Sequence, residues 1–468
     1  MSNVSRREVL LGGGAVLAAA TAGGLTAARA TVADHRLVIA PYRASLVPGT
    51  VTEGMMSFAA DAMPPVLRLR QGETVQIDVE NRLDEASIVH WHGLRVPNRF
   101  DGVPYLTQPP IHSGETFRYE LTSEDAGTYW YHPHCNTLDQ MARGLTGLLV
   151  VEEAEPVGFD QDLPLNIRDF RLGSDGQFID LFKARSAARG GTLGTVSTVN
   201  WQQEPVYDLP AGSLVRLRLA VTDVTRVGTY DLMNADVPAS PETARVIALD
   251  SNPVPASLPA AGILLAPGQR ADIAMRVPST EGQELVLTRQ SARGPKPLAR
   301  FRAVGASAGR SLDELKPLPR NPISEPDLAN AEVLEFLFGW TPEGAPPIAS
   351  VCGSLGYTFW SINRIAWEGD TPDPVGPLSV MRKGRSYILR LRNETPNDHP
   401  IHLHGMTFRL LRSNKRPLPP LWTDTALLLE GETMEVALVA DNPGDWAFHC
   451  HVIEHQKTGL TGYLRVEA

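Results

Sequence analysis

Four short His-x-His motifs, two in the first third of the chain and two in the last, constrain what this sequence can fold into. Residues i and i+2 of a β-strand point to the same face. Each motif on a strand would therefore direct two imidazoles to one side, and all eight could meet only if the two ends of the chain pack together. The spacing predicts a multinuclear metal site at such an interface. The motifs are His90/His92, His132/His134, His402/His404 and His449/His451.

Histidine is scarce outside these motifs. Of the 12 histidines, His399 and His455 lie beside the two later motifs, and only His35 and His112 lie elsewhere. A single His-x-His motif is more often a pair of surface or core histidines than a metal site, but four together are hard to explain without a metal. Imidazole ligands suit copper, zinc, iron or nickel.

One cysteine makes copper the preferred metal. Cys450 lies between His449 and His451, so on a strand its side chain points to the opposite face. There it can meet His455 and His399, and two imidazoles with one thiolate form the trigonal blue-copper ligand set. Zinc would suit any one histidine cluster, but it does not explain a cysteine between two histidines. A short stretch of backbone would then join two copper sites and carry electrons between them.

Alternating apolar and polar residues predict an all-β fold. The alternation covers residues 66–70, 74–79, 214–219 and 387–392. A turn glycine precedes three of these segments, at Gly72, Gly212 and Gly384. This spacing is typical of three similar β-sandwich units.

Composition divides the chain further. The proline-rich segment 312–329 reads as a linker, and a weaker boundary lies near residue 155. We therefore place domains at residues 31–155, 156–311 and 330–468. The formal net charge of −10 and pI of about 5.7 argue against a nucleic-acid binder.

The first 30 residues read as an export signal. Arg6 and Arg7 precede an apolar stretch, and Ala28-Arg29-Ala30 resembles a cleavage site. Paired arginines indicate the twin-arginine machinery, although an ordinary secretion signal is the alternative. The stretch is too short and glycine-rich for a stable membrane span. We expect a bacterial protein that is periplasmic or otherwise exported.

The three cysteines form no disulfide framework. Cys135 and Cys352 could pair, but two such residues are more often buried thiols.

These motifs resemble those of the multicopper oxidases. The resemblance covers the first and last domains, where residues 101–104, 107–111 and 127–132 also look like the family's first domain. It implies three cupredoxin-like Greek-key β-sandwich domains, of which the middle one binds no copper. It also implies laccase-like oxidation of a reductant by single electrons, with dioxygen reduced to water.

The resemblance implies roles for four copper ions, and it assigns Asp101 as a carboxylate that supplies or relays protons. The type 1 copper would be held by His399, Cys450 and His455. The type 2 copper would be held by His90 and His402. The type 3 pair would be held by His92, His132, His134, His404, His449 and His451.

The chain departs from the family pattern at two positions. Leu460 stands where many bacterial members carry a weak axial methionine, which predicts a three-coordinate type 1 copper with a raised reduction potential. Gln456 stands where several carry a glutamate implicated in proton delivery. Glu454 is near in sequence, but the direction of its side chain does not follow from the sequence.

The reductant is less constrained. A phenol would need an exposed edge of His455 and a shallow pocket, and this is the favoured interpretation. Oxidation of Mn(II), Fe(II) or Cu(I) is the alternative, and residues 187–192 look like a manganese-oxidising bacterial subgroup. The carboxylates that such a site could use, Asp370, Asp373 and Asp424, read as solvated surface or turn residues. A non-enzymatic copper-binding or envelope scaffold protein is a further alternative, which retention of all the ligand residues opposes.

Overall fold

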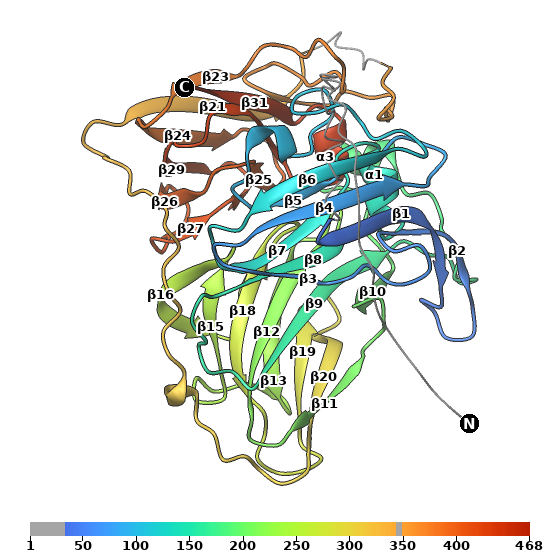
Figure 1. Ribbon diagram of the computed structural model, residues 1–468, viewed down its shortest axis with the longest axis vertical. Coiled ribbons are helices and arrows are strands. Elements are labelled where there is room, and N and C mark those ends of the chain that lie inside the picture. The colour runs from blue at the N-terminus through green and yellow to red at the C-terminus, as the bar shows by residue number, and fades with distance from the viewer. Residues whose placement is uncertain (1–32, 343–348) are drawn as a thin grey trace, which may run out of the picture. The chain divides into compact units, whose positions relative to one another are not determined.

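The structure is a computed structural model that describes residues 33–342 and 349–468 (Figure 1). The export signal predicted for residues 1–30 lies outside the described residues. Residues 33–468 form one compact unit, and nearly all of its regular structure is β-strand. The predicted all-β fold class is confirmed. In the described part of the chain, no helix is long and apolar enough to cross a membrane.

The first stretch of chain, drawn in blue to cyan in Figure 1, forms two four-stranded sheets. The sheets enclose a hydrophobic core to which both contribute, with Ile77 from one and Tyr131 from the other. One sheet has the order β2 (Thr52–Ser57), β1 (His35–Ala44), β4 (Thr74–Asn81), β6 (Thr116–Thr122). The other has the order β3 (Leu67–Arg70), β8 (Gly147–Glu152), β7 (Gly127–His132), β5 (His90–His92). The short helix η1 (Asn98–Phe100) lies between β5 and β6 and so between the two sheets, and α1 (Thr137–Ala142) lies between β7 and β8 of the second sheet.

The middle stretch also forms two sheets around a core of its own. The first sheet has the order β10 (Val196–Val199), β9 (Gln161–Phe170), β12 (Leu214–Val221), β18 (Arg270–Arg276), β15 (Ala244–Leu249), β16 (Asn252–Pro259). The second has the order β11 (Val206–Pro210), β20 (Lys296–Val304), β19 (Glu284–Arg289), β13 (Gly228–Asn234), β14 (Val237–Pro238), with β17 (Ile263–Leu265) beside β13. A short helix, α2 (Ala184–Ala187), lies between β9 and β10.

The last stretch, in orange to red, repeats the arrangement. One sheet has the order β22 (Trp360–Ile362), β21 (Glu332–Trp340), β24 (Ser386–Asn393), β29 (Thr433–Val439), β26 (Phe408–Ser413), β27 (Trp422–Thr423). The other has the order β23 (Ser379–Arg382), β31 (Thr461–Glu467), β30 (Gly444–Cys450), β25 (His399–Leu403), β28 (Thr425–Leu428). The helix α3 (Ile453–Lys457) lies between β30 and β31, whereas η2 (Leu312–Glu314) precedes β21 in the chain and packs through Leu312 against the middle stretch.

The three stretches share one pairing pattern. In each, an early strand pairs in parallel with the strand that follows the predicted turn glycine: β1 with β4, β9 with β12, and β21 with β24. Gly72, Gly212 and Gly384 all have positive φ, which glycine adopts without steric cost. The three similar units expected from the alternation are therefore present. Their domain boundaries stay a prediction, because all three pack into one compact unit.

Candidate metal centre

Two pairs of antiparallel strands hold the histidine motifs in register. His90 of β5 lies opposite His132 of β7, and His402 of β25 lies opposite His449 of β30. The first strand pair belongs to the first stretch of chain and the second to the last. The interface that the His-x-His spacing predicts is therefore formed.

All eight imidazoles of the four motifs are buried and converge on one place. Their ligand atoms fall into three groups, and within each group the atoms lie within 4.8 Å of one another. All three groups combine histidines from the first and the last stretch of the chain. The groups are His90/His92/His402, His92/His132/His451 and His134/His404/His449.

The ring nitrogens of this eight-histidine cluster are arranged as metal ligands are. In six rings one nitrogen is 2.8 to 3.2 Å from a carbonyl, carboxylate or hydroxyl oxygen of the chain, as is usual for metal-bound imidazoles. Four of these rings leave the other nitrogen buried with no hydrogen-bond partner among the described residues; they are His90, His92, His132 and His402. The inner nitrogens of His404 and His449 face each other at 3.0 Å. Buried nitrogens without partners are costly unless they bind an ion, so the cluster fits metal ions.

Burial also keeps these ligands neutral. Burial, followed by repulsion from neighbouring imidazoles, lowers the pKa of His132, His134 and His404 well below the usual value. Burial likewise lowers the pKa of His449 to about 3. Neutral imidazole is the form that binds a metal.

His399, Cys450 and His455 form a second buried group on the other side of β30. The Cys450 Sγ lies 3.6 Å from Nδ1 of each histidine, and the two Nδ1 atoms lie 3.1 Å apart. Donor atoms about 2.0–2.3 Å from one shared ion would have roughly this separation. One thiolate and two imidazoles favour copper. Burial raises the pKa of the Cys450 thiol, a cost that a bound cation would offset.

Asp101 connects histidines from both ends of the chain. Its Oδ2 accepts a hydrogen bond from His404 Nδ1 at 2.9 Å, and its backbone oxygen accepts one from His90 Nδ1 at 2.8 Å. The other carboxylate oxygen lies 3.3 Å from the same nitrogen of His90. Asp101 is buried, so it orients two rings from a position beside the cluster.

Asp424 is a second carboxylate at the cluster, and the sequence interpretation of it as a solvated residue is wrong. It is buried, with Oδ1 3.2 Å from His92 Nε2, and its backbone oxygen accepts from His402 Nδ1 at 2.9 Å. Arg270 of the middle stretch donates to both carboxylate oxygens, at 2.8 and 2.6 Å. Although burial raises the pKa of Asp424, the charge of Arg270 holds it well below the usual value.

The two departures from the family pattern also have definite places. Leu460 is fully buried in the same hydrophobic cluster as Cys450, whose backbone N–H donates to the Leu460 carbonyl at 3.0 Å. Gln456 is buried, and its amide nitrogen lies 3.0 Å from His134 Nε2. Glu454 points elsewhere, because its carboxylate accepts a hydrogen bond from the Thr192 amide.

The expectation of an exposed edge on His455 is wrong. This residue is 0% exposed, and its Nε2 is 2.5 Å from the carbonyl oxygen of Arg189. The segment 184–192, which includes α2, lies over it. The same segment accepts a hydrogen bond from Trp360 Nε1 at the Ala187 carbonyl, 2.9 Å away. A reductant therefore has no direct contact with His455 in this conformation.

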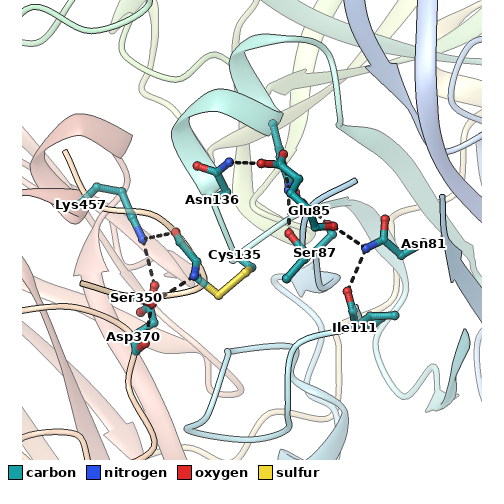
Figure 2. The surroundings of a disulfide bond; sticks show 12 residues. Asn81, Glu85, Ser87, Ile111, Cys135, Asn136, Ser350, Asp370 and Lys457 are labelled. Atoms are coloured by element: carbon teal, nitrogen blue, oxygen red, sulfur yellow. Dashed lines mark hydrogen bonds and ion pairs between the residues drawn. A yellow bond between two sulfur atoms is a disulfide. The ribbon is translucent and has the colours of Figure 1, made fainter. Parts of the chain in front are cut away.

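A disulfide links the first and last stretches of chain, which decides between the two states considered for Cys135 and Cys352. Figure 2 shows this bond beside the start of α1. On the Cys352 side, Lys457 donates to the Cys352 carbonyl at 3.2 Å and pairs with Asp370 at 2.9 Å (Figure 2). Asp370 is thus a buried ion-pair partner and not the solvated residue expected, whereas Asp373 is exposed.

Comparisons with known proteins agree with this geometry. Two family models, both described as multicopper oxidase, match residues 42–156 and 346–468. The chain is similar to a crystal structure of a multi-copper oxidase from Pseudomonas thermotolerans, with 40% identity and a TM-score of 0.81, covering 93% of this chain and 100% of that one.

Two further relatives are more distant. Multicopper oxidase MmcO of Mycobacterium tuberculosis is 28% identical over 86% of this chain and 81% of its own. A laccase-like multi-copper oxidase, CueO, from the lignin-degrading bacterium Ochrobactrum sp. is 25% identical, with a TM-score of 0.75, over 92% of this chain and 96% of that one. It is described as having oxidase activity towards lignin model compounds and lignosulfonate.

Proposed function

The chain belongs to the multicopper oxidase family and is a copper-dependent oxidoreductase that uses dioxygen, and from this premise we propose that its reductants are phenolic. The observation that carries the oxidase part of the proposal, transfer of electrons from a reductant to dioxygen, is the joining of two sites by β30. Cys450 belongs to the trio with His399 and His455 on one side of the strand. His449 and His451, its neighbours in the sequence, belong to the eight-histidine cluster on the other side. An electron that arrives at the Cys450 thiolate therefore reaches the eight-histidine cluster through the backbone of one adjacent residue, His449 or His451.

We assign four coppers in this proposal. The trio His399/Cys450/His455 would hold the type 1 ion, and His90 with His402 would hold the type 2 ion. The other six histidines would hold the type 3 pair; they are His92, His132, His134, His404, His449 and His451. Bound copper would supply one-electron redox chemistry at the trio and four-electron reduction of dioxygen to water at the cluster.

Residues around the cluster orient the ligand histidines, and one of them can relay protons. Asp101 orients His404 and His90, and its buried carboxylate lies beside the cluster, where it can pass protons to reduced oxygen. Gln456 is an amide, so it positions His134 without supplying a proton. Arg270 fixes Asp424, which in turn holds His402.

Two features favour phenols over metal ions as reductants. Two of the three carboxylates considered for a metal-ion substrate, Asp370 and Asp424, are buried in ion pairs with Lys457 and Arg270. The Ochrobactrum relative is described as acting on lignin model compounds. Export by the twin-arginine route to the periplasm fits a protein that acquires its metal before export, and we include it in the proposal.

The test is oxygen uptake by the copper-loaded protein with 2,6-dimethoxyphenol and, separately, with Mn(II). We expect uptake with the phenol. Uptake with Mn(II) alone would replace the phenolic proposal with metal-ion oxidation. A protein that binds copper, is blue and consumes no oxygen with either reductant would support the scaffold alternative.

A further inference from the structure

Two stacked tryptophans connect the His399/Cys450/His455 trio to the surface. Trp340 ends β21 and lies opposite Trp360, which begins β22. The two rings are nearly parallel, with 17° between their planes and 4.2 Å between their centroids. The Trp360 ring lies 4.8 Å from the His455 ring and 5.3 Å from the His399 ring, between centroids. The four rings form one unbroken set of aromatic contacts.

The two ends of this set differ in exposure. Trp360 is 0% exposed and is held by its hydrogen bond to the Ala187 carbonyl, whereas Trp340 is 39% exposed. His455 offers no such surface, because Arg189 and its neighbours cover it. Among the described residues, Trp340 is therefore the exposed aromatic group that stacks directly on Trp360, and a bulky reductant that touches its ring can exchange electrons with the trio.

We propose that Trp340 is a surface site where phenolic polymers deliver electrons, and that Trp360 conducts these electrons to the trio; this rests on the proposed function. Electron-rich aromatic rings stack on an exposed indole face, so the site suits phenols. The phenol loses one electron and one proton and becomes a phenoxyl radical. The electron passes through both indoles to the trio, where a bound cupric ion would accept it and become cuprous, and the proton goes to water at the exposed face.

The first experiment compares two variants. Trp340→Ala removes the exposed ring, and Tyr357→Ala is the matched control. Tyr357 is 45% exposed, and its ring contacts among the described residues are with Phe182 and Phe359. Copper-loaded proteins are mixed with lignosulfonate without oxygen, and loss of the blue colour is followed. We expect bleaching to slow at least about tenfold in Trp340→Ala and by less than about twofold in Tyr357→Ala.

The second experiment needs no copper. The copper-free protein is treated with a tryptophan-selective alkylating reagent, with and without lignosulfonate, and modification is located by peptide mass spectrometry. We expect lignosulfonate to protect Trp340. Bleaching of Trp340→Ala at the wild-type rate, or an unprotected Trp340, would overturn the inference.

The outcomes also separate this inference from the proposed function. If the wild type consumes oxygen with 2,6-dimethoxyphenol while Trp340→Ala bleaches normally, only the tryptophan route fails. If the wild type consumes no oxygen with any phenol, the proposed function itself fails.

Discussion

At the scale of single residues, Asp101 offers the sharpest test of the cluster. Its carboxylate accepts from His404, and its backbone oxygen accepts from His90. Asp101→Asn keeps the shape but removes the ionisable group, so we expect oxygen reduction to fall by roughly 10–100-fold. The measurement is oxygen uptake at saturating phenol. Anaerobic bleaching of the blue colour is the control and should be unchanged, because it does not involve the cluster; equal uptake by variant and wild type would contradict the assignment.

Leu460 gives a second prediction at this scale. It has no lone pair and is buried with Cys450, so a methionine there would add a weak sulfur donor beside the trio. We expect Leu460→Met to lower the reduction potential of the type 1 copper, as measured by redox titration of the blue colour. A potential that is unchanged or higher would show that this residue does not occupy the axial position.

Single residues also show where prediction from sequence ended. The ligand histidines could be found because strand periodicity fixes where i and i+2 point. Asp424 could not, because its contact with His402 depends on how β25 and β28 pair, and its contact with His92 depends on how the two ends of the chain pack together. Trp340 and Trp360 could not be found either, since nothing in the sequence around a tryptophan indicates that its ring stacks beside a metal ligand. The sequence did not reveal that His455 is covered, because the segment that covers it lies some 260 positions earlier in the chain.

At the scale of elements, the segment 184–192 controls the surroundings of His455. Gly191 has φ of +89°, and a Cβ there would lie 2.6 Å from Thr225 Cγ2. We expect Gly191→Ala to destabilise the protein by about 1–3 kcal/mol and to displace the Arg189 carbonyl from His455. Thermal unfolding and the position of the blue absorption band would report the two effects.

The same segment supplies a control. A Cβ on Gly190 meets no atom within 4 Å, and its φ is not positive. Gly190→Ala should therefore leave both the unfolding temperature and the band unchanged. If the two variants behave alike, the segment does not constrain His455.

The turn between β15 and β16 carries a pH-dependent group. Burial, together with the charge of Asp424, raises the pKa of Asp250 to about 7 against the effect of Arg270. In the unfolded chain this pKa is near 4. Between these two pKa values the folded protein keeps a proton on Asp250 that the unfolded chain releases. The contribution of Asp250 to the free energy of unfolding is therefore complete below about pH 4 and is lost as the pH rises through about 7.

Asp250→Asn removes this titration. We expect the free energy of unfolding of the copper-free wild type, relative to the variant, to fall by on the order of 3 kcal/mol between pH 4 and pH 8. Unfolding by urea at several pH values would measure the difference. Parallel pH profiles for the two proteins would contradict a raised pKa at Asp250.

At the scale of the whole molecule, the sequence predicted that the ends of the chain meet, but not how they are held. Eight histidines split between the first and last thirds require that contact. The disulfide could not be deduced, because two cysteines 217 positions apart carry no local signal of pairing. The middle stretch was expected only to contain no copper, yet it supplies Arg270 and Arg189 to the two sites.

The disulfide and the copper cluster both join the first and last stretches, so their contributions to stability should be coupled. Replacing Cys135 and Cys352 by serine should cost about 2–5 kcal/mol, because the bond closes a long loop in the unfolded chain. Removing copper should also destabilise the protein, since the ion binds only when both ends are together. Without the disulfide, fewer links join the ends and bound copper should contribute more to holding them, so chelation should destabilise the double variant more than the wild type. Thermal inactivation rates of both proteins, with and without a chelator, measure this coupling. Strictly additive effects would mean that the two links stabilise separate parts of the fold.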